Sequence, residues 1–152
     1  MKTRREALMH GSTVLALLAT AGLLSQPAHA AWAKAAFDAK TLAETVKSLG
    51  GGTATESKDV SITGPDIAEN GAVVPLGASS TLAGVKQLLI LVEKNPSALV
   101  AMFNVTDAVD ANFSTRAKMG QSSDVYAVAI MNDGRALWAK KEVKVTLGGC
   151  GG

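Results

Sequence analysis

Apolar and polar residues alternate along most of the chain after residue 53, and this alternation predicts β-strands. Val, Ile and Thr are frequent there, and turn residues recur about every eight to twelve positions, as in a β-sandwich. We predict strands near residues 58–63, 73–77, 85–93, 98–105, 113–119, 124–131 and 136–147. The pattern therefore predicts an all-β domain over 53–147, folded as an immunoglobulin-like antiparallel β-sandwich.

The last of these segments shows the alternation most clearly. One parity is mostly apolar and comprises Leu137, Ala139, Lys141, Val143, Val145 and Leu147. The other parity is polar from residue 140 onward and comprises Lys140, Glu142, Lys144 and Thr146. Asn132-Asp133-Gly134 precedes this strand and predicts a hairpin turn. Segment 85–92 is apolar almost throughout and also fits a buried helix, but Gly84 and the β-branched residues favour a strand.

Apolar residues with helical spacing occur only ahead of this domain, between residues 37 and 49. Phe37, Leu42, Val46 and Leu49 are separated by five, four and three positions, and Gly50 begins a run of three glycines. This arrangement predicts a short amphipathic helix that ends at the glycines. We assign residues 31–52 to this N-terminal helix and a glycine linker.

Residues 1–30 have the layout of a secretory signal peptide. A basic start is followed by an apolar run over 13–24 and by Ala28-His29-Ala30, an A-x-A cleavage site. The run is shorter than the ~20 residues of a membrane span, so we expect no membrane segment. Arg4-Arg5 favours twin-arginine export over general secretion. The predicted location is therefore the periplasm.

Removal of residues 1–30 changes the chemistry that the chain can perform. It takes away three basic residues and one acidic residue, which cancels the formal charge of +2, so we expect no nucleic-acid partner. His10 and His29 are both removed as well. The mature chain therefore has no histidine base or ligand, and we predict no cofactor, no metal site and no enzymatic activity of its own.

The single cysteine, Cys150, lies in the terminal sequence GGCGG. A lone cysteine is usually a small buried residue, but Gly148, Gly149, Gly151 and Gly152 offer no apolar side chain to bury it. We therefore interpret 148–152 as a flexible arm that carries a covalently attached passenger. Cys150 lies three positions after Leu147, so the sulfur can reach roughly 10 Å beyond the last strand, into the channel of another protein.

Residues 63–76, TGPDIAENGAVVPL, contain several turn-forming residues. Asn70-Gly71 predicts a turn, and Pro75 is typical of a strand edge. From these residues alone we interpret the segment as a loop that enters a strand.

Four segments together resemble the SoxY family, the sulfur-carrier subunit of the bacterial SoxYZ thiosulfate-oxidation complex. They are PDIAENGAVVP, LLILVEKNPSALVAMF, STRAKMGQSSDVYAVA and KVTLGGCGG. The resemblance implies that Cys150 is the covalent sulfur attachment site and that the four neighbouring glycines form a swinging arm. It also implies a heterodimer with a SoxZ-like subunit, and transient docking to SoxAX-, SoxB- and, in systems that have it, SoxCD-like enzymes.

Two alternatives remain open at this point. In the first, the protein is a member of a related group, the SoxYZ-like carriers that accompany other periplasmic dehydrogenases, and its passenger is a different sulfur species. In the other alternative the protein is a structural subunit whose cysteine forms an intermolecular disulfide.

Overall fold

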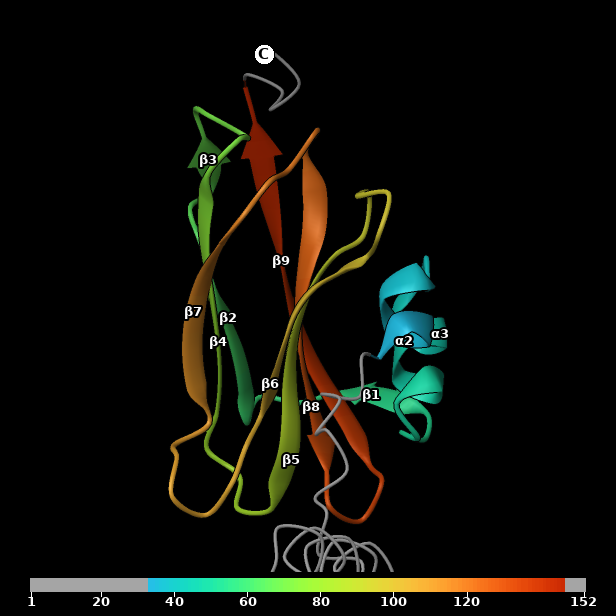
Figure 1. Cartoon of the computed structure of the whole chain (residues 1–152). Helices are drawn as coiled ribbons and strands as arrows, with labels where there is room; N and C mark the ends of the chain where they lie inside the picture. The colour runs from blue at the N-terminus through green and yellow to red at the C-terminus, as the bar shows by residue number, and fades with distance from the viewer. Residues whose placement is uncertain (1–32, 147–152) are drawn as a thin grey trace, which may run out of the picture. The chain divides into compact units, whose positions relative to one another are not determined.

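Two β-sheets pack face to face, and two short helices cover the outer face of the larger sheet (Figure 1). The computed structural model describes residues 33–146. The predicted signal peptide and glycine arm lie outside this range. The all-β sandwich expected from the alternation is confirmed.

The larger sheet has the strand order β1-β9-β8-β5-β6, and β3 also pairs with β9. Its strands are β1 (Ala54–Glu56), β3 (Ile67–Ala68), β5 (Val85–Val92), β6 (Leu99–Asn104), β8 (Ser123–Met131) and β9 (Ala136–Val145). The smaller sheet has the order β2-β4-β7, with β2 (Val60–Thr63), β4 (Val74–Ser80) and β7 (Asn112–Ala117).

All seven predicted strands are present, and the pairs they form with one another are antiparallel, as expected. The short strands β1 and β3 were not predicted, and both run parallel to β9. The antiparallel description therefore holds for the long strands, and two short parallel additions flank β9.

The main core lies between the two sheets. Leu88, Ile90 and Val92 of β5 point into it, and each is fully buried. From the smaller sheet, Val74 and Leu76 of β4 pack against them. Burial of each such side chain stabilises the fold by about 1.5–3 kcal/mol, so the two sheets are held mainly by this layer.

A second core lies between the larger sheet and the helices. Leu89 and Leu91, which alternate with the residues just named, point into it together with Ala36 and Val46 of the helices. From Leu88 to Val92, strand β5 is therefore buried on both faces, which explains why this part of its sequence is apolar and shows no alternation. The prediction of a strand over 85–92 is confirmed.

The helical segment differs from the single helix that the spacing predicted. It forms α2 (Lys34–Asp38) and α3 (Leu42–Ser48), with Ala39 in an extended conformation between them. Thr41 caps α3 by accepting a hydrogen bond from the Glu44 N–H, so a new helix begins there. The glycine stop is confirmed, since Gly50 has a φ of +78° just after α3, a conformation that glycine adopts without strain.

The hairpin between β8 and β9 forms as predicted. Gly134 has a φ of +85°, and the antiparallel ladder closes at Ile130 and Ala136. The side-chain parity of β9 is also as predicted, with Val143 fully buried in the main core. On the opposite parity Trp138 packs into the second core, so the beginning of β9 is covered on both faces.

Candidate functional site

The chemistry predicted for this chain lies at its carboxyl terminus. Cys150 and the arm residues Gly148, Gly149, Gly151 and Gly152 lie outside the described residues. The structure describes the strand that leads to them as far as Thr146. The described part of the site is therefore the base of the arm, which is the end of β9.

On one side, residues 66–71 hold the end of β9; we call this segment the strap. It contains β3 and lies beside the tip of β9 (Figure 1). The Lys144 N–H donates to the Asp66 carbonyl oxygen at 3.0 Å, and the Thr146 N–H donates to the Ala68 carbonyl oxygen at 3.1 Å. Because β3 and β9 run parallel, alternate N–H groups of β9 are bound along the strap.

On the other side, β8 and the residue before it hold β9. The ladder between the two strands ends at Ser123 and Val143. Beyond it, the Val145 N–H donates to Ser122 Oγ at 2.9 Å. The three consecutive N–H groups of residues 144–146 are therefore all bound, alternately to the strap and to Ser122. This fixes the direction in which the chain leaves the domain.

The strap is itself attached to the domain at both ends. At its beginning, Lys141 Nζ lies 2.8 Å from Asp66 Oδ1 in an ion pair. At its end, the Met119 N–H donates to the Gly71 carbonyl oxygen at 2.7 Å, and Met119 is fully buried. Between these points Ala68 is buried and Ile67 is exposed. The strap is thus a folded part of the domain and not a free loop.

The interpretation of 63–76 as a loop missed this role. The turn at Asn70 is confirmed, because its Oδ1 accepts a hydrogen bond from the Ala72 N–H at 2.8 Å. At Pro75, β4 pairs only with β7, since the β2 ladder ends at Gly77. The two-residue strand β3 escaped detection because alternation needs at least four residues to be visible.

Three lysines of β9 precede the arm in sequence, and a cation close to a thiol lowers the thiol pKa. Lys140 Nζ lies 2.8 Å from Asp124 Oδ2, and this hydrogen bond raises the lysine pKa. Lys141 is paired with Asp66 and holds the pKa of that carboxyl below its ordinary value. Lys144 forms no ion pair with another described residue. Two of the three cations are thus already neutralised by carboxylates.

Comparison with known proteins identifies the family to which this chain belongs. A family model described as sulfur oxidation protein SoxY matches residues 46–150. The chain belongs to the SoxY family. The matched range includes the strap and ends at Cys150, so it joins the described base of the arm to the cysteine that the sequence singles out.

A solved SoxY structure agrees with this assignment. The sulfur carrier protein SoxY from Chlorobium limicola f thiosulfatophilum is 31% identical, with a TM-score of 0.62, over 70% of this chain and 96% of that one. This chain is accordingly a sulfur carrier protein of sulfur oxidation. A superoxide reductase (neelaredoxin) from Ignicoccus hospitalis is 16% identical, with a TM-score of 0.51, over 57% of this chain and 78% of that one. This second likeness shows the fold alone. No curated protein matched.

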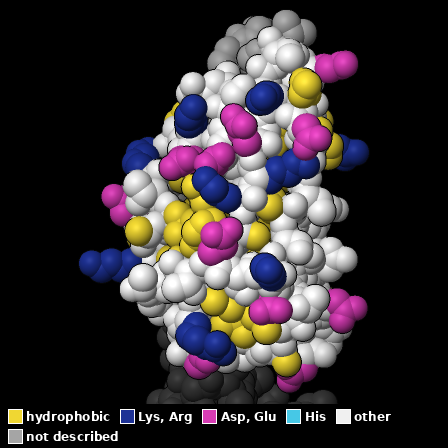
Figure 2. All heavy atoms as spheres, turned by 180° about the vertical axis from the view of Figure 1, so that it is seen from behind, with side chains coloured by type: hydrophobic (Ala, Val, Ile, Leu, Met, Phe, Trp, Pro, Cys, Tyr) yellow, Lys and Arg dark blue, Asp and Glu magenta, His cyan; other side chains and the backbone are white. Residues whose placement is uncertain are grey.

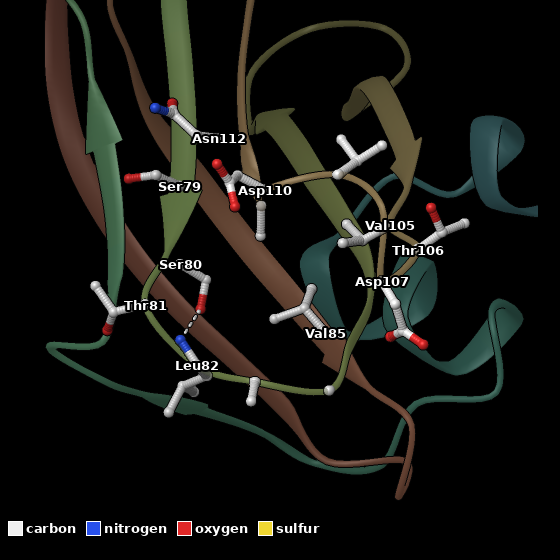
Figure 3. Close-up of a pocket in the computed structure, with 14 residues that line it drawn as sticks. Ser79, Ser80, Thr81, Leu82, Val85, Val105, Thr106, Asp107, Asp110 and Asn112 are labelled. Carbon is white, nitrogen blue, oxygen red and sulfur yellow. Dashed lines mark hydrogen bonds between the residues drawn. The ribbon is translucent and has the colours of Figure 1, made fainter.

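A depression of about 660 Å³ lies at the opposite end of this SoxY-family domain from the tip of β9 (Figure 1). The β4–β5 and β6–β7 connections line it, and Ser80, Asp107 and Asp110 face it (Figure 3). Ser80 Oγ is occupied locally, since it accepts a hydrogen bond from the Leu82 N–H at 3.3 Å. In the described part of the chain, no three His, Cys, Asp or Glu side chains are grouped so as to hold a metal ion.

The surface of the domain carries both signs of charge. Seen from behind, basic and acidic side chains are intermingled, with hydrophobic groups between them (Figure 2). This face therefore has no extended field of one sign of the kind that binds nucleic acid. None of the helices within residues 33–146 is long and apolar enough to cross a membrane.

Proposed function

We propose that this chain carries thiosulfate-derived sulfur groups on Cys150 in the periplasm. The observation that supports this most strongly is the family match, which runs as far as Cys150. The signal-like residues 1–30 support an exported protein. The arrangement at the base of the arm supports a thiol presented at one fixed place on the domain.

The proposed cycle has two steps on the same sulfur. In the first, the Cys150 thiol and the sulfane sulfur of thiosulfate form an S–S bond, which releases the thiol proton and two electrons to a haem enzyme of the SoxAX type. In the second, water cleaves the bond between the outer sulfur and the sulfonate group under a SoxB-type hydrolase. This step releases sulfate and a proton and leaves a persulfide on Cys150. Where a SoxCD-like enzyme is present, it oxidises that remaining sulfur.

The protein is a carrier and not a catalyst in this proposal. Residues 31–152 contain no histidine to act as a base. An ordinary thiol with a pKa near 8.5 is only a few per cent ionised at neutral pH, and two nearby lysines are engaged by Asp66 and Asp124. Activation of the thiol is therefore assigned to the partner enzymes. A SoxZ-like subunit is the proposed permanent partner.

The base of the arm limits how the thiol can be used. Thr146 is held by the strap, and Cys150 lies four positions further along the chain. At full extension these span at most about 14 Å. The thiol can therefore enter a channel of that depth, but it cannot visit several enzymes unless the whole domain docks on each in turn.

The substitution Cys150→Ser tests the proposal. It replaces the thiol with a hydroxyl of similar size at the end of the chain, so folding and assembly with the SoxZ-like subunit should be unchanged. We expect thiosulfate-dependent electron transfer to fall to the level of a reaction without carrier in a reconstituted system, because this chain has no second cysteine. Size-exclusion chromatography of the heterodimer is the control.

Three outcomes would favour the alternatives. Thiosulfate oxidation that continues with Cys150→Ser would remove the carrier role from this cysteine. A permanent, reduction-sensitive dimer on non-reducing electrophoresis, formed in every growth condition, would favour a structural disulfide. Loading with a different sulfur compound and not with thiosulfate would favour a SoxYZ-like carrier for another dehydrogenase.

A further inference from the structure

One exposed apolar side chain lies directly beside the base of the arm. Ile67 of β3 is 56% exposed and lies opposite Lys144 of β9. The next residue, Ala68, is only 6% exposed and packs into the main core. The short strand therefore fixes Ile67 on the outer surface, one ladder step from the end of β9.

The backbone of β3 has a free side at the same place. The carbonyl groups of Asp66 and Ala68 both accept hydrogen bonds from β9. Because successive residues of a strand present their polar groups to opposite sides, the N–H and C=O of Ile67 point away from β9. Among the described strands, β3 pairs only with β9. An exposed apolar side chain and an unpaired strand edge thus coincide, and edges of this kind pair readily with another chain.

Because the arm is short, an enzyme that binds its thiol must also contact the domain surface beside Ile67. The Cα atom of Cys150 can lie no more than about 14 Å from that of Thr146, and the thiol extends only one side chain further. An enzyme that takes the thiol into a channel must therefore bring the mouth of that channel against the surface around Thr146. Ile67 lies on that surface, and so do Glu69, whose carbonyl oxygen is 3.4 Å from Thr146 Oγ1, and the exposed Lys144.

We propose that the outer side of β3, formed by Ile67, Glu69 and Lys144, is the docking surface for the enzymes that act on the arm thiol. This inference rests on the proposed function. The occupant is the channel mouth of such an enzyme, which contacts Ile67 with apolar side chains and pairs with the free backbone edge of β3. The acidic Glu69 and the basic Lys144 nearly cancel in charge, so association depends on apolar contact and only weakly on salt.

A second exposed apolar residue provides a matched control. Val109 is 47% exposed and lines the depression formed by the β4–β5 and β6–β7 connections. Gly84 of the same depression accepts a hydrogen bond from the Asn132 N–H in the β8–β9 hairpin, at the beginning of β9. Strand β9 has 10 residues and spans about 33 Å, so Val109 lies at the opposite end of the domain from the arm.

The test compares Ile67→Ser with Val109→Ser in the purified heterodimer with a SoxZ-like subunit. The measured quantity is the Kd for a purified SoxAX-type enzyme, determined by calorimetry in a Cys150→Ser background so that no turnover occurs. We expect Ile67→Ser to raise the Kd about tenfold, as for loss of an apolar anchor at an interface. Val109→Ser should leave it nearly unchanged. In the Cys150 protein, Ile67→Ser should raise KM while the rate with a small thiol reagent stays constant.

Other outcomes would overturn the inference. Equal Kd values for Ile67→Ser and the parent protein would exclude the surface from docking. Loss of the heterodimer in Ile67→Ser would identify the surface as the subunit interface. If the proposed function fails, Cys150→Ser leaves thiosulfate oxidation intact, yet the binding comparison still reports whether Ile67 contacts the enzyme.

Discussion

The two ends of β9 are stabilised by different means. At its beginning, a short turn, Asn132-Asp133-Gly134, joins it to the neighbouring strand. At its end, Lys144–Thr146 are bound by the strap and by Ser122, which lie far away in sequence. The first arrangement involves only neighbouring residues and joins β8 to β9 in a hairpin. The second is assembled from distant segments and holds the residues that precede the proposed arm, so local sequence does not encode this end of β9.

The largest effect is expected from a charge on the side of the strap that faces the main core. Ala68→Asp would bury a carboxylate at a position that is 6% exposed and packs into the main core. We expect a loss of about 3 kcal/mol in the free energy of unfolding of the strap. Hydrogen exchange of the Lys144 and Thr146 amides should accelerate, while that of Ile90 in the core changes less.

The control for this variant lies directly after the strap. Ala72→Asp places the same charge at an exposed position next to the turn, and exchange at Lys144 should remain at the parent rate. Equal exchange rates in Ala68→Asp and Ala72→Asp would show that the strap does not hold the end of β9.

A smaller effect is expected at the hairpin end. Gly134 has a φ of +85°, so Gly134→Ala introduces a Cβ into a left-handed conformation and should lower the free energy of unfolding by about 1–2 kcal/mol. Sulfur transfer should be unaffected, because the arm end of β9 is untouched. Urea denaturation measures the first quantity and reconstituted turnover the second.

Gly52→Ala is the matched control for the hairpin. A Cβ at Gly52 would meet the Gly134 carbonyl oxygen at 3.5 Å, an ordinary contact. This change should be neutral or slightly stabilising, because alanine restricts the unfolded chain. A loss of turnover in Gly134→Ala without loss of stability would contradict the conclusion that the hairpin end of β9 contributes to stability and not to sulfur transfer.

The smallest effects are expected from two exposed ion pairs, one at each end of β9. Lys141 lowers the pKa of Asp66, and hydrogen bonds from Arg135 lower that of Asp133. A lowered folded-state pKa contributes stability above the unfolded value near 3.8, and this contribution is lost as the pH falls through the folded pKa. Asp66→Asn and Asp133→Asn should therefore be slightly less stable than the parent at neutral pH.

The two asparagine variants are distinguished by pH and by function. Both differences from the parent should shrink below pH 3.8 in urea titrations. Only Asp66→Asn should increase exchange at Lys144, since only Asp66 belongs to the strap. A difference that persists unchanged at low pH would assign the effect to something other than these carboxylates.

The sequence alone predicted most of the sandwich, because the long strands alternate or are wholly apolar. It missed β1 and β3, which have three and two residues and pair in parallel with β9, since neither length nor ladder partner is visible locally. It also merged α2 and α3, although Thr41 and Glu44 mark a second helix start. The cysteine was evident from its glycine neighbours, whereas the strap around Asp66 could not be found because its partner Lys141 lies far along the chain.

Whether Cys150 carries the sulfur group is tested most directly by the mass of the carboxyl-terminal peptide. The protein would be purified without reductant from cells supplied with thiosulfate, and the same peptide from thiosulfate-free cells would serve as the reference. We predict a thiosulfonate or persulfide adduct on the peptide that contains Cys150, present only with thiosulfate. An unmodified thiol in both samples, or the same peptide disulfide-linked in both, would contradict the carrier role.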